Sequence, residues 1–231
     1  MNGRRLLLFD VDGTLLSSGP RGRRVFADAL TEVFGTCGDV DGFRFEGKLD
    51  PAIVAELMEG AGIAPDVVRA SLSRALTRYL DALEAAFTEG GPPTLKPGVA
   101  ALLDALEAEP SAVRALLTGN VERGARLKLT AAGLWHRFAF GVWGDEGACR
   151  EDLGPRALEK ARAVTRIEFT GKECVVIGDS RHDVACGLAL GARVVAVATG
   201  QTSAADLAAA GAHIVLPDFS DLERAREAIL A

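Results

Sequence analysis

The sequence predicts a doubly wound α/β fold in which a helical domain interrupts a parallel sheet. From residue 99 to the end, short apolar runs alternate with amphipathic stretches, a pattern typical of strands joined by crossover helices. A strong apolar run also lies at residues 5–10, but nothing of comparable strand character follows before residue 92. The first strand therefore belongs to the later sheet, and the segment between the two is an insertion.

The insertion begins soon after the first strand. A polar, glycine-containing stretch at 17–22 leads into three segments with helical periodicity, the second of which carries proline in its first turn. The expected helices span residues 23–34, 51–59 and about 65–88. Glycine and proline are dense at residues 89–98, which predicts a linker or hinge at the end of the insertion.

The remaining elements alternate in type. The expected strands lie at residues 113–117, 138–142, 174–177, 193–198 and 213–216. The expected helices lie at residues 99–108, 121–132, 152–164, 182–190 and 203–210, with a last helix ending the chain. Because helices separate successive strands, the sheet is mostly parallel and covered on both faces. We therefore assign residues 1–16 and 93–231 to an α/β core domain and residues 17–92 to a helical cap domain.

The composition limits the class of protein. At 231 residues, with 48% hydrophobic and 25% charged residues, the chain is that of an ordinary globular protein with a substantial core. Its net charge of -6 argues against a nucleic-acid partner, and no apolar run approaches the length of a membrane span. The four cysteines form neither a C-x-x-C pair nor a metal-binding spacing, which favours reduced thiols. We expect a cytoplasmic monomer or homodimer that acts on a small molecule.

Two aspartates close the first strand. Asp10 and Asp12 follow an apolar run and precede Gly13, at the edge where open parallel sheets place their chemistry. In an extended chain both carboxylates face the same way, and at about 4 Å they repel by roughly 4 kcal/mol in an effective dielectric of about 20. The pair therefore needs a cation, a proton or a turn that separates the two groups, and the first option points to a metal.

Two further polar clusters follow predicted strands. Thr118, Gly119 and Asn120 precede a helix, so a hydroxyl and free N–H groups at a helix N-terminus would form a phosphate-sized anion site. The alternative is a plain helix cap, since threonine and asparagine favour that position. Asp179 ends another strand and Asp183 opens the next helix. Helix stabilisation alone would account for one of these two acids but not for both.

A cation is expected between the strand near residue 140 and the helix near residue 152. The candidates are Arg150, Arg156 and Lys160. Arg156 and Lys160 have the (i, i+4) spacing that is common among solvated charges on one helix face, whereas Arg150 lies in the preceding loop. We favour Arg150 as the residue that balances the carboxylates or holds a phosphate.

The motifs together resemble a known family. The segments DVDGT at 10–14, LLTGN at 116–120 and VVIGDSRHDV at 175–184 resemble motifs one, two and four of the haloacid dehalogenase superfamily. Their order and spacing are similar to members with a helical cap after the first motif, of which phosphoglycolate phosphatase is a typical example. Motif three usually contains lysine followed by proline. The corresponding loop here has neither, and Arg150 is the replacement that we expect.

The resemblance implies a role for each acid. Asp10 would be the nucleophile, and Asp12 the acid that protonates the leaving alcohol and then the base that activates water. Asp10, the backbone carbonyl of Asp12, and Asp179 would bind Mg²⁺, whose preference for oxygen ligands fits this set. Asp183 would orient the site from behind these ligands.

Other residues would hold the substrate. Thr118, Gly119 and Asn120 would bind the phosphoryl oxygens, and Arg150 would offset their charge. Gly13, with Thr14 beside it, would allow close approach of the backbone. Lys48 belongs to a charged loop at residues 45–50, similar to the specificity loop of helical-capped relatives, although Leu49 replaces a threonine there. Lys48 could reach an anionic substrate tail, and the alternative is a solvated loop lysine.

These expectations amount to a Mg²⁺-dependent phosphatase that hydrolyses a phosphoglycolate-like molecule or a sugar phosphate through an aspartyl phosphate. A dehalogenase would have no use for the acid at Asp12. A phosphosugar mutase would keep Asp12 but must suppress hydrolysis of the aspartyl phosphate, and the sequence leaves this alternative open. A regulatory phosphate-binding protein on the same fold would be expected to lose one of the four acids, and all four are present.

Overall fold

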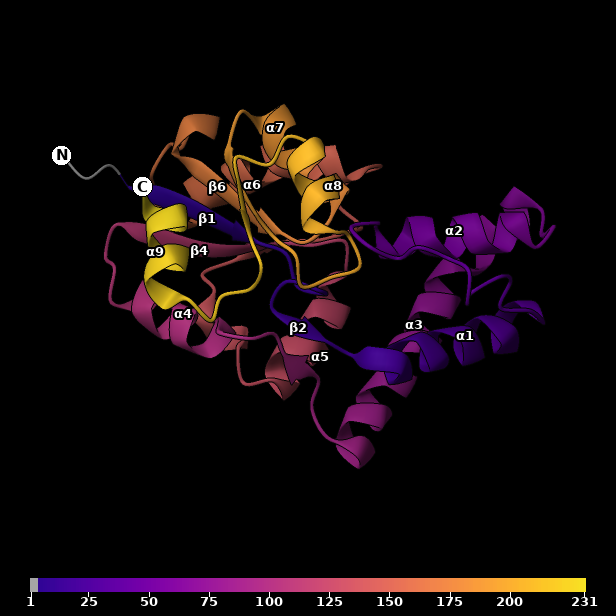
Figure 1. The fold of residues 1–231 in the computed structure, drawn as a ribbon. Helices are drawn as coiled ribbons and strands as arrows, with labels where there is room; N and C mark the ends of the chain where they lie inside the picture. Colours follow the sequence, from indigo (N-terminus) through magenta and orange to yellow (C-terminus); the bar gives the residue numbers. More distant parts are fainter. Residues whose placement is uncertain (1–3) are drawn as a thin grey trace.

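A computed structural model describes residues 4–231, so the first three residues of the predicted core segment 1–16 lie outside the described part. A six-stranded parallel sheet with the order β5-β4-β1-β6-β7-β8 forms the centre of the larger part (Figure 1). Its strands are β1 (Arg5–Phe9), β4 (Ala112–Leu117), β5 (Gly141–Val142), β6 (Cys174–Gly178), β7 (Arg193–Val197) and β8 (Ile214–Leu216).

The first strand lies in the middle of the sheet. β1 pairs with β4 on one side and with β6 on the other, and in this register Leu6 lies opposite both Val113 and Cys174. The chain runs outward from β1 through β4 to β5 on one side, and later from β6 through β7 to β8 on the other. The carboxyl end of β1 is therefore the switch point where such sheets bind ligands. The sheet order therefore directs attention to Asp10, the residue that follows β1.

Helices cover both faces of the sheet. Leu7 and Phe9 of β1 pack into one apolar cluster with α4 and α9, whereas Leu6 and Leu8 pack into another with α6. Because alternate side chains of a strand point to opposite faces, one uniformly apolar run supplies both cores. The covering helices are α4 (Val99–Glu107), α5 (Glu122–Ala131), α6 (Leu153–Thr165), α7 (Arg181–Leu190), α8 (Ala204–Ala209) and α9 (Leu222–Leu230). This arrangement confirms the predicted doubly wound α/β fold.

The inserted segment forms three helices with an apolar core of their own. α1 (Gly19–Phe34), α2 (Asp50–Gly60) and α3 (Pro65–Gly90) enclose residues such as Phe26, Leu30 and Leu83, and the Phe26 and Tyr79 rings meet edge to face at 5.0 Å. Figure 1 shows these helices beyond the carboxyl ends of β1 and β4, at the opposite end of the molecule from the C-terminus. The helical segment therefore lies beside the edge where the site is expected.

The two connections to the helical segment pair with each other, which the sequence did not predict. β2 (Leu16–Ser17) and β3 (Thr94–Leu95) form a two-stranded antiparallel sheet between the two parts. The expected linker at 89–98 is wrong at its start, because α3 continues to Gly90 and the Arg21 guanidinium donates to the carbonyls of Ala86 and Gly91. Strands of two residues are too short to leave a periodic pattern.

Two other boundaries differ from expectation. α1 begins at Gly19 and not at residue 23, because Pro20 occupies the first turn, where its missing N–H costs nothing. The strand expected at 138–142 is assigned over β5 alone, since a turn of 3₁₀ helix (Trp135–Arg137) precedes it, although Ala139 and Phe140 also form backbone hydrogen bonds with β4. Among residues 4–231, no helix is both long and apolar enough to cross a membrane.

Candidate functional site

Three neighbouring strands end at the candidate site. Asp10 follows β1, Thr118 follows β4, and Asp179 follows β6, and the sheet order places β1 between the other two. The Asp10 N–H donates to the carbonyl of Ile177 at 2.9 Å, so the pairing of β1 with β6 continues to the first acid. The parallel sheet thus brings together side chains that are more than 100 positions apart in the sequence.

The two aspartates of the first motif lie in different surroundings, and a turn follows them. Gly13 has a φ of +89°, and a Cβ there would overlap the Asp179 carboxylate, so this position requires glycine. Asp10 is 6% exposed, whereas the side chain of Asp12 is 40% exposed and lies in a different environment. Asp10 pairs with Arg150 and Asp12 with Lys128, so each acid has its own cation. The separate cations reduce the repulsion expected of an extended pair, although the charge of Asp12 still contributes to the raised pKa of Asp10.

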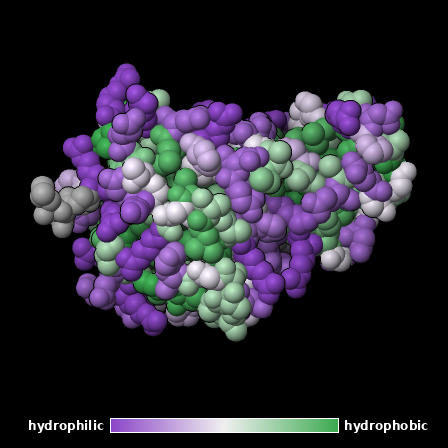
Figure 2. All heavy atoms as spheres, turned by 90° about the horizontal axis from the view of Figure 1, so that it is seen from above, coloured by the Kyte–Doolittle hydropathy of each residue, from purple (hydrophilic) through white to green (hydrophobic). Residues whose placement is uncertain are grey.

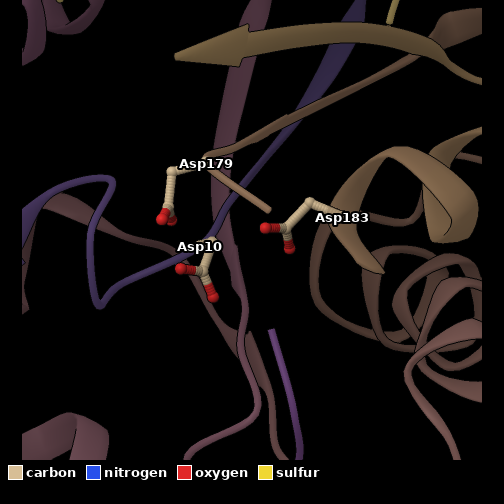
Figure 3. Close-up of side chains that lie close together, drawn as sticks. All are labelled: Asp10, Asp179 and Asp183. Carbon is tan, nitrogen blue, oxygen red and sulfur yellow. The ribbon is translucent and has the colours of Figure 1, made fainter. Parts of the chain in front are cut away.

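Asp10, Asp179 and Asp183 form a buried acidic cluster. One carboxylate oxygen from each lies within 4.8 Å of the others, and Figure 3 shows the Asp179 and Asp183 side chains directed toward Asp10. Burial, reinforced by the charge of Asp183, raises the pKa of Asp10 to about 7, and burial with the charge of Asp10 raises the pKa of Asp179 well above its ordinary value. Such a cluster favours either protons or a hard cation.

The hydrogen bonds of the cluster distinguish its members. Asp10 accepts from Arg150 through Oδ1, and Asp179 accepts from Thr14 through Oδ1 at 2.9 Å, while within residues 4–231 their Oδ2 atoms accept no hydrogen bond. Both oxygens of Asp183 are engaged, Oδ1 by Arg150 and Oδ2 by the N–H and hydroxyl of Ser180. The donor set therefore fits a metal bound by Asp10 and Asp179 and oriented by Asp183.

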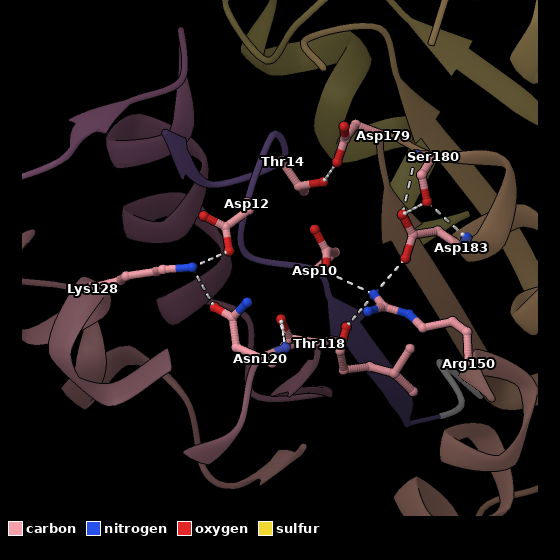
Figure 4. A network of polar contacts seen from close by, with 11 residues as sticks. Asp10, Asp12, Thr14, Thr118, Asn120, Lys128, Arg150, Asp179, Ser180 and Asp183 are labelled. Carbon is pink, nitrogen blue, oxygen red and sulfur yellow. Dashed lines mark hydrogen bonds and ion pairs between the residues drawn. The ribbon is translucent and has the colours of Figure 1, made fainter. Parts of the chain in front are cut away.

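Arg150 is buried, and its guanidinium lies between Asp10 and Asp183 (Figure 4). Its Nη2 donates to Asp10 at 2.7 Å, to Asp183 at 2.5 Å and to the carbonyl of Leu117 at 2.8 Å. Its Nε and Nη1 are buried without a hydrogen-bond partner among the described residues, and Nη1 lies close to Gly119. Because unpaired buried donors are costly, these nitrogens are suited to receive oxygens of a bound anion.

The two alternative cations lie elsewhere. Arg156 pairs with Glu159 at 2.9 Å, and its side chain is 54% exposed. Lys160 donates to the carbonyl of Gly141 and pairs with Glu146 at 2.5 Å. Of the three candidates, only Arg150 contacts the acids, which supports our choice for the third motif.

The loop after β4 carries the predicted anion site. Thr118 is buried, and its hydroxyl accepts from the Asn120 N–H at 3.3 Å. The N–H of Val121, which caps α5, is already taken by Asp50 Oδ2 at 3.0 Å. The helix N-terminus is therefore less available to a substrate than the sequence suggested, because a carboxylate of the helical segment occupies part of it.

The remaining predicted substrate contacts differ in their surroundings. Thr14 is fully buried, and its hydroxyl donates a hydrogen bond to Asp179 Oδ1. This contact favours a role in orienting that acid over the predicted role in binding substrate. Lys48 faces the cavity, but its ammonium already pairs with Glu56 and lies 4.8 Å from the Phe43 ring centroid. Its charge is thus largely satisfied before any substrate arrives.

A cavity of about 320 Å³ lies between the helical segment and the core. Asp10, Asp12 and Arg150 line it from the core, and Phe26 and Lys48 line it from the helical segment. Figure 2 shows a largely hydrophilic surface where the two parts meet. At the contact, the Asp50 N–H donates to the carbonyl of Gly119 at 2.7 Å, and a Cβ at Gly119 would overlap the Lys48 carbonyl. The two parts are thus in direct contact around the site.

Sequence reasoning missed Lys128. This residue lies inside α5 and is 4% exposed, and its ammonium donates to Asp12 and Asn120. The signal was present, because Lys128 stands three positions after Ala125 and directly before Leu129, both on the buried face of the helix. A lysine on an apolar helix face calls for a buried counter-charge.

The raised pKa values predict how stability depends on pH. Native Asp10, with a pKa of about 7, and Asp50, with a pKa raised by burial to about 6, bind protons that unfolded carboxyls with a pKa of about 4 do not. The contribution of these bound protons to the free energy of unfolding is fully present below the pKa of the unfolded carboxyls. It is lost as the pH rises through 6 and 7. We therefore expect the metal-free protein to melt several degrees higher at pH 5.5 than at pH 8.

Calorimetry in the presence of a chelator measures this effect. A divalent cation should raise the melting temperature more at pH 8, where the acids are ionised, than at pH 5.5. Asp10→Asn should flatten the dependence, because it removes one of the titrating groups. A metal-free protein that is equally stable at both pH values, or more stable at pH 8, would contradict the proton binding inferred here.

Comparisons with known proteins agree with the motifs. A sequence model described as haloacid dehalogenase-like hydrolase matches residues 7–187, and a second, described as haloacid dehalogenase hydrolase-like, matches residues 154–222. The phosphoglycolate phosphatase of Xylella fastidiosa is 30% identical over 188 residues, covering 81% of this chain and 77% of the relative. That of Rhodospirillum rubrum is 32% identical over 234 residues, covering 94% and 89%.

The fold also resembles that of a solved structure. The crystal structure of a predicted phosphatase from Clostridium acetobutylicum superimposes with a TM-score of 0.75 at 21% identity, covering 96% of this chain and 98% of the other. At that identity the likeness concerns the fold alone. It extends over both the sheet and the helical segment, since almost the whole of each chain is included.

Proposed function

Since the chain belongs to the haloacid dehalogenase-like hydrolase family and is a phosphatase of that family, we propose that it hydrolyses a small phosphate monoester with the help of Mg²⁺, through an aspartyl phosphate. The observation that carries the proposal is the unequal environment of the first two acids. Asp10 is buried against Arg150, whereas Asp12 is half exposed to the cavity and held by Lys128. A nucleophile needs the first setting and a proton carrier needs the second.

In the first step, a carboxylate oxygen of Asp10 attacks phosphorus. The bond between phosphorus and the ester oxygen breaks, and its electron pair stays on that oxygen, which takes a proton from Asp12. In the second step, Asp12 accepts a proton from water, whose oxygen attacks the phosphorus of the aspartyl phosphate. The bond to Asp10 then breaks, and phosphate leaves with Asp10 restored. Splitting the reaction in this way divides a barrier that is very high in water.

Asp10 and Asp179 would hold the metal through their Oδ2 atoms, with the backbone carbonyl of Asp12 as a third ligand. When bound, Mg²⁺ offsets the negative charge of the acids and of the phosphoryl group. The chemistry of the acidic cluster supports this assignment. Its carboxylate oxygens lie within 4.8 Å of one another, and Mg²⁺ prefers oxygen ligands. Asp183 would keep Arg150 and the ligands in position without binding the ion itself.

The transferred group would be held by Thr118, by the backbone at Gly13, Gly119 and Asn120, and by Arg150. The Nε and Nη1 of Arg150 support its part, because they are buried donors without a partner among the described residues, and phosphoryl oxygens could accept from them. A guanidinium offers more donors in a fixed plane than the lysine usual for motif three. The exchange therefore preserves the charge and adds hydrogen bonds.

We propose residues 17–92 as a cap that opens to admit substrate and closes over it. The curated relatives reported above are phosphoglycolate phosphatases, and a cavity of about 320 Å³ suits a leaving group of that size or a sugar. Lys48 would meet an anionic tail of the substrate by exchanging its partner Glu56 for it. Four free cysteines fit a reducing compartment, and we place the protein in the cytoplasm as a monomer or homodimer.

An assay with a generic aryl phosphate tests this proposal. We expect phosphate release in the presence of Mg²⁺ and loss of release after chelation, because the cluster of acids repels the phosphoryl group without a cation. A panel that contains phosphoglycolate and several sugar phosphates should identify better substrates than the aryl ester. An inert protein on the whole panel, with Mg²⁺ present, would contradict the hydrolase, and conversion of one sugar phosphate to its isomer would indicate a mutase.

A further inference from the structure

Lys128 is a buried cation outside the family motifs. Its side chain is 6% exposed, and its ammonium lies 2.6 Å from Asp12 Oδ2 and 2.9 Å from Asn120 Oδ1 (Figure 4). Helix stability does not require a charge at this position. A lysine at an exposed position of the helix would avoid the free-energy cost of removing its ammonium from water. The ion pair with Asp12 compensates for removing the ammonium from water, and it raises the pKa of Lys128.

The surroundings of Lys128 come from both parts of the molecule. Asp12 and Asn120 belong to the core, whereas Asp50 begins α2 and Tyr79 lies in α3, and all four line the same cavity with Lys128. The charge of Lys128 opposes the effect of burial on the pKa of both Asp50 and Tyr79. The cap thus supplies part of the environment that keeps this lysine buried.

Close packing fixes the cap against α5 at the same place. Gly124 lies one turn before Lys128, and a Cβ there would be 3.2 Å from Leu80 of α3 and 3.7 Å from Asp50 Oδ2. Asp50 also accepts from the Val121 N–H at 3.0 Å and donates its own N–H to the Gly119 carbonyl. Movement of the cap would remove these contacts from α5 together.

We propose that Lys128 is a positioning residue that couples closure of the cap to the placement of the Asp12 carboxylate. With the cap closed, Asp50 and Tyr79 complete the surroundings of Lys128, and the ammonium holds Asp12 toward the cavity. With the cap open, water reaches Lys128, and its bond to Asp12 competes with solvent. Asp12, which serves as acid and base, is therefore in place only when the site is closed. The two chemical steps are then confined to the closed state.

Removing the ammonium has two separable consequences. In Lys128→Met, Asp12 loses its anchor, and Asp50 becomes a buried carboxylate without a nearby cation, which disfavours closure. In the double variant Asp50→Asn with Lys128→Met, the second problem disappears, because a neutral amide oxygen can still accept from the Val121 N–H. The first problem remains. Comparison of the two variants therefore separates a role on Asp12 from a role in closing the cap.

Two measurements follow the two consequences. Hydrogen exchange at the Asp50 and Val121 amides reports closure, because both N–H groups donate across the contact between cap and core. The rate of phosphate release from the aryl ester reports the placement of Asp12. In Lys128→Met we expect faster exchange at both amides and a kcat about 10- to 100-fold lower, with KM changed much less. Lys160→Met, which removes a lysine paired with Glu146 away from the acids, serves as the matched control and should change neither.

The double variant decides the question. We expect it to regain slow exchange at both amides while its kcat stays as low as that of Lys128→Met. Recovery of kcat together with exchange would overturn the role of Lys128 on Asp12, and unchanged exchange in Lys128→Met would overturn the coupling to the cap. This inference rests on the proposed function, but a wild-type protein without phosphatase activity would refute that function alone, since exchange reads the coupling independently of turnover.

Discussion

Asp10→Asn will lower phosphate release by about 10⁴-fold or more while the protein stays folded. The amide keeps the shape of the side chain and can still accept from Arg150 Nη2, but it carries no nucleophilic oxygen anion. Because burial already favours a neutral group at this position, the variant should melt no lower than the wild type at pH 8 without metal. Loss of activity with retained stability would locate the defect in the chemistry.

Steady-state kinetics with Mg²⁺ and calorimetry measure the two parts of this prediction. Asp104→Asn is the matched control, because it makes the same change at an exposed aspartate that pairs with Arg137 at 2.7 Å, and it should leave kcat unchanged. Incubation of the wild type with substrate followed by rapid acid quenching should trap phosphate on Asp10, and mass spectrometry should find none on the variant. Substantial activity in Asp10→Asn would exclude Asp10 as the nucleophile.

Arg150→Ala will lower kcat by about 10²- to 10³-fold, far more than Arg156→Ala. The substitution removes the donors that we propose for the phosphoryl group and leaves Asp10 and Asp183 without their shared cation. Breaking a buried pair of this kind also costs about 3 kcal/mol or more of stability, so the melting temperature should fall. Arg150→Lys should recover part of the activity, because it restores the charge but not the planar set of donors.

Arg156 provides the comparison, since its exposed ion pair with Glu159 touches nothing in the site. Measurements at a temperature well below the lower melting point, with folding verified by circular dichroism, separate lost chemistry from lost protein. Equal and mild losses in Arg150→Ala and Arg156→Ala would show that neither serves as the third motif. A large loss in Arg156→Ala alone would transfer the role to that residue.

The sequence carried enough information for the fold because the sheet is built from mainly apolar runs. β6 and all of β1 after Arg5 are buried on both faces and carry no charged side chain, so periodicity and composition agree. The acids that follow these strands could be grouped in advance for the same reason, since parallel strands bring their carboxyl ends to one edge. Asp10, Asp179 and Asp183 do lie within reach of one another.

The parts that could not be predicted depend on contacts between the cap and the core. Nothing in the local sequence of Asp50 shows that its carboxylate meets the start of α5, because the partner is 71 positions away. Lys128 could have been noticed as a lysine on an apolar helix face, but its partner Asp12 could not be assigned without the packing of α5. The short strands β2 and β3 stabilise each other only after both connections have been brought together.

The pairing of β2 with β3 also has a consequence for how such a protein can change over time. The chain leaves the core at Ser17 and returns at Thr94, and these two residues are partners in the same ladder. Since the insertion starts and finishes at adjacent points, its length and helix content can vary without moving the strands that carry Asp10 and Asp179. If residues 17–92 act as the proposed cap, this segment can be exchanged for another to accommodate a different leaving group while the strands that carry Asp10 and Asp179 stay in place.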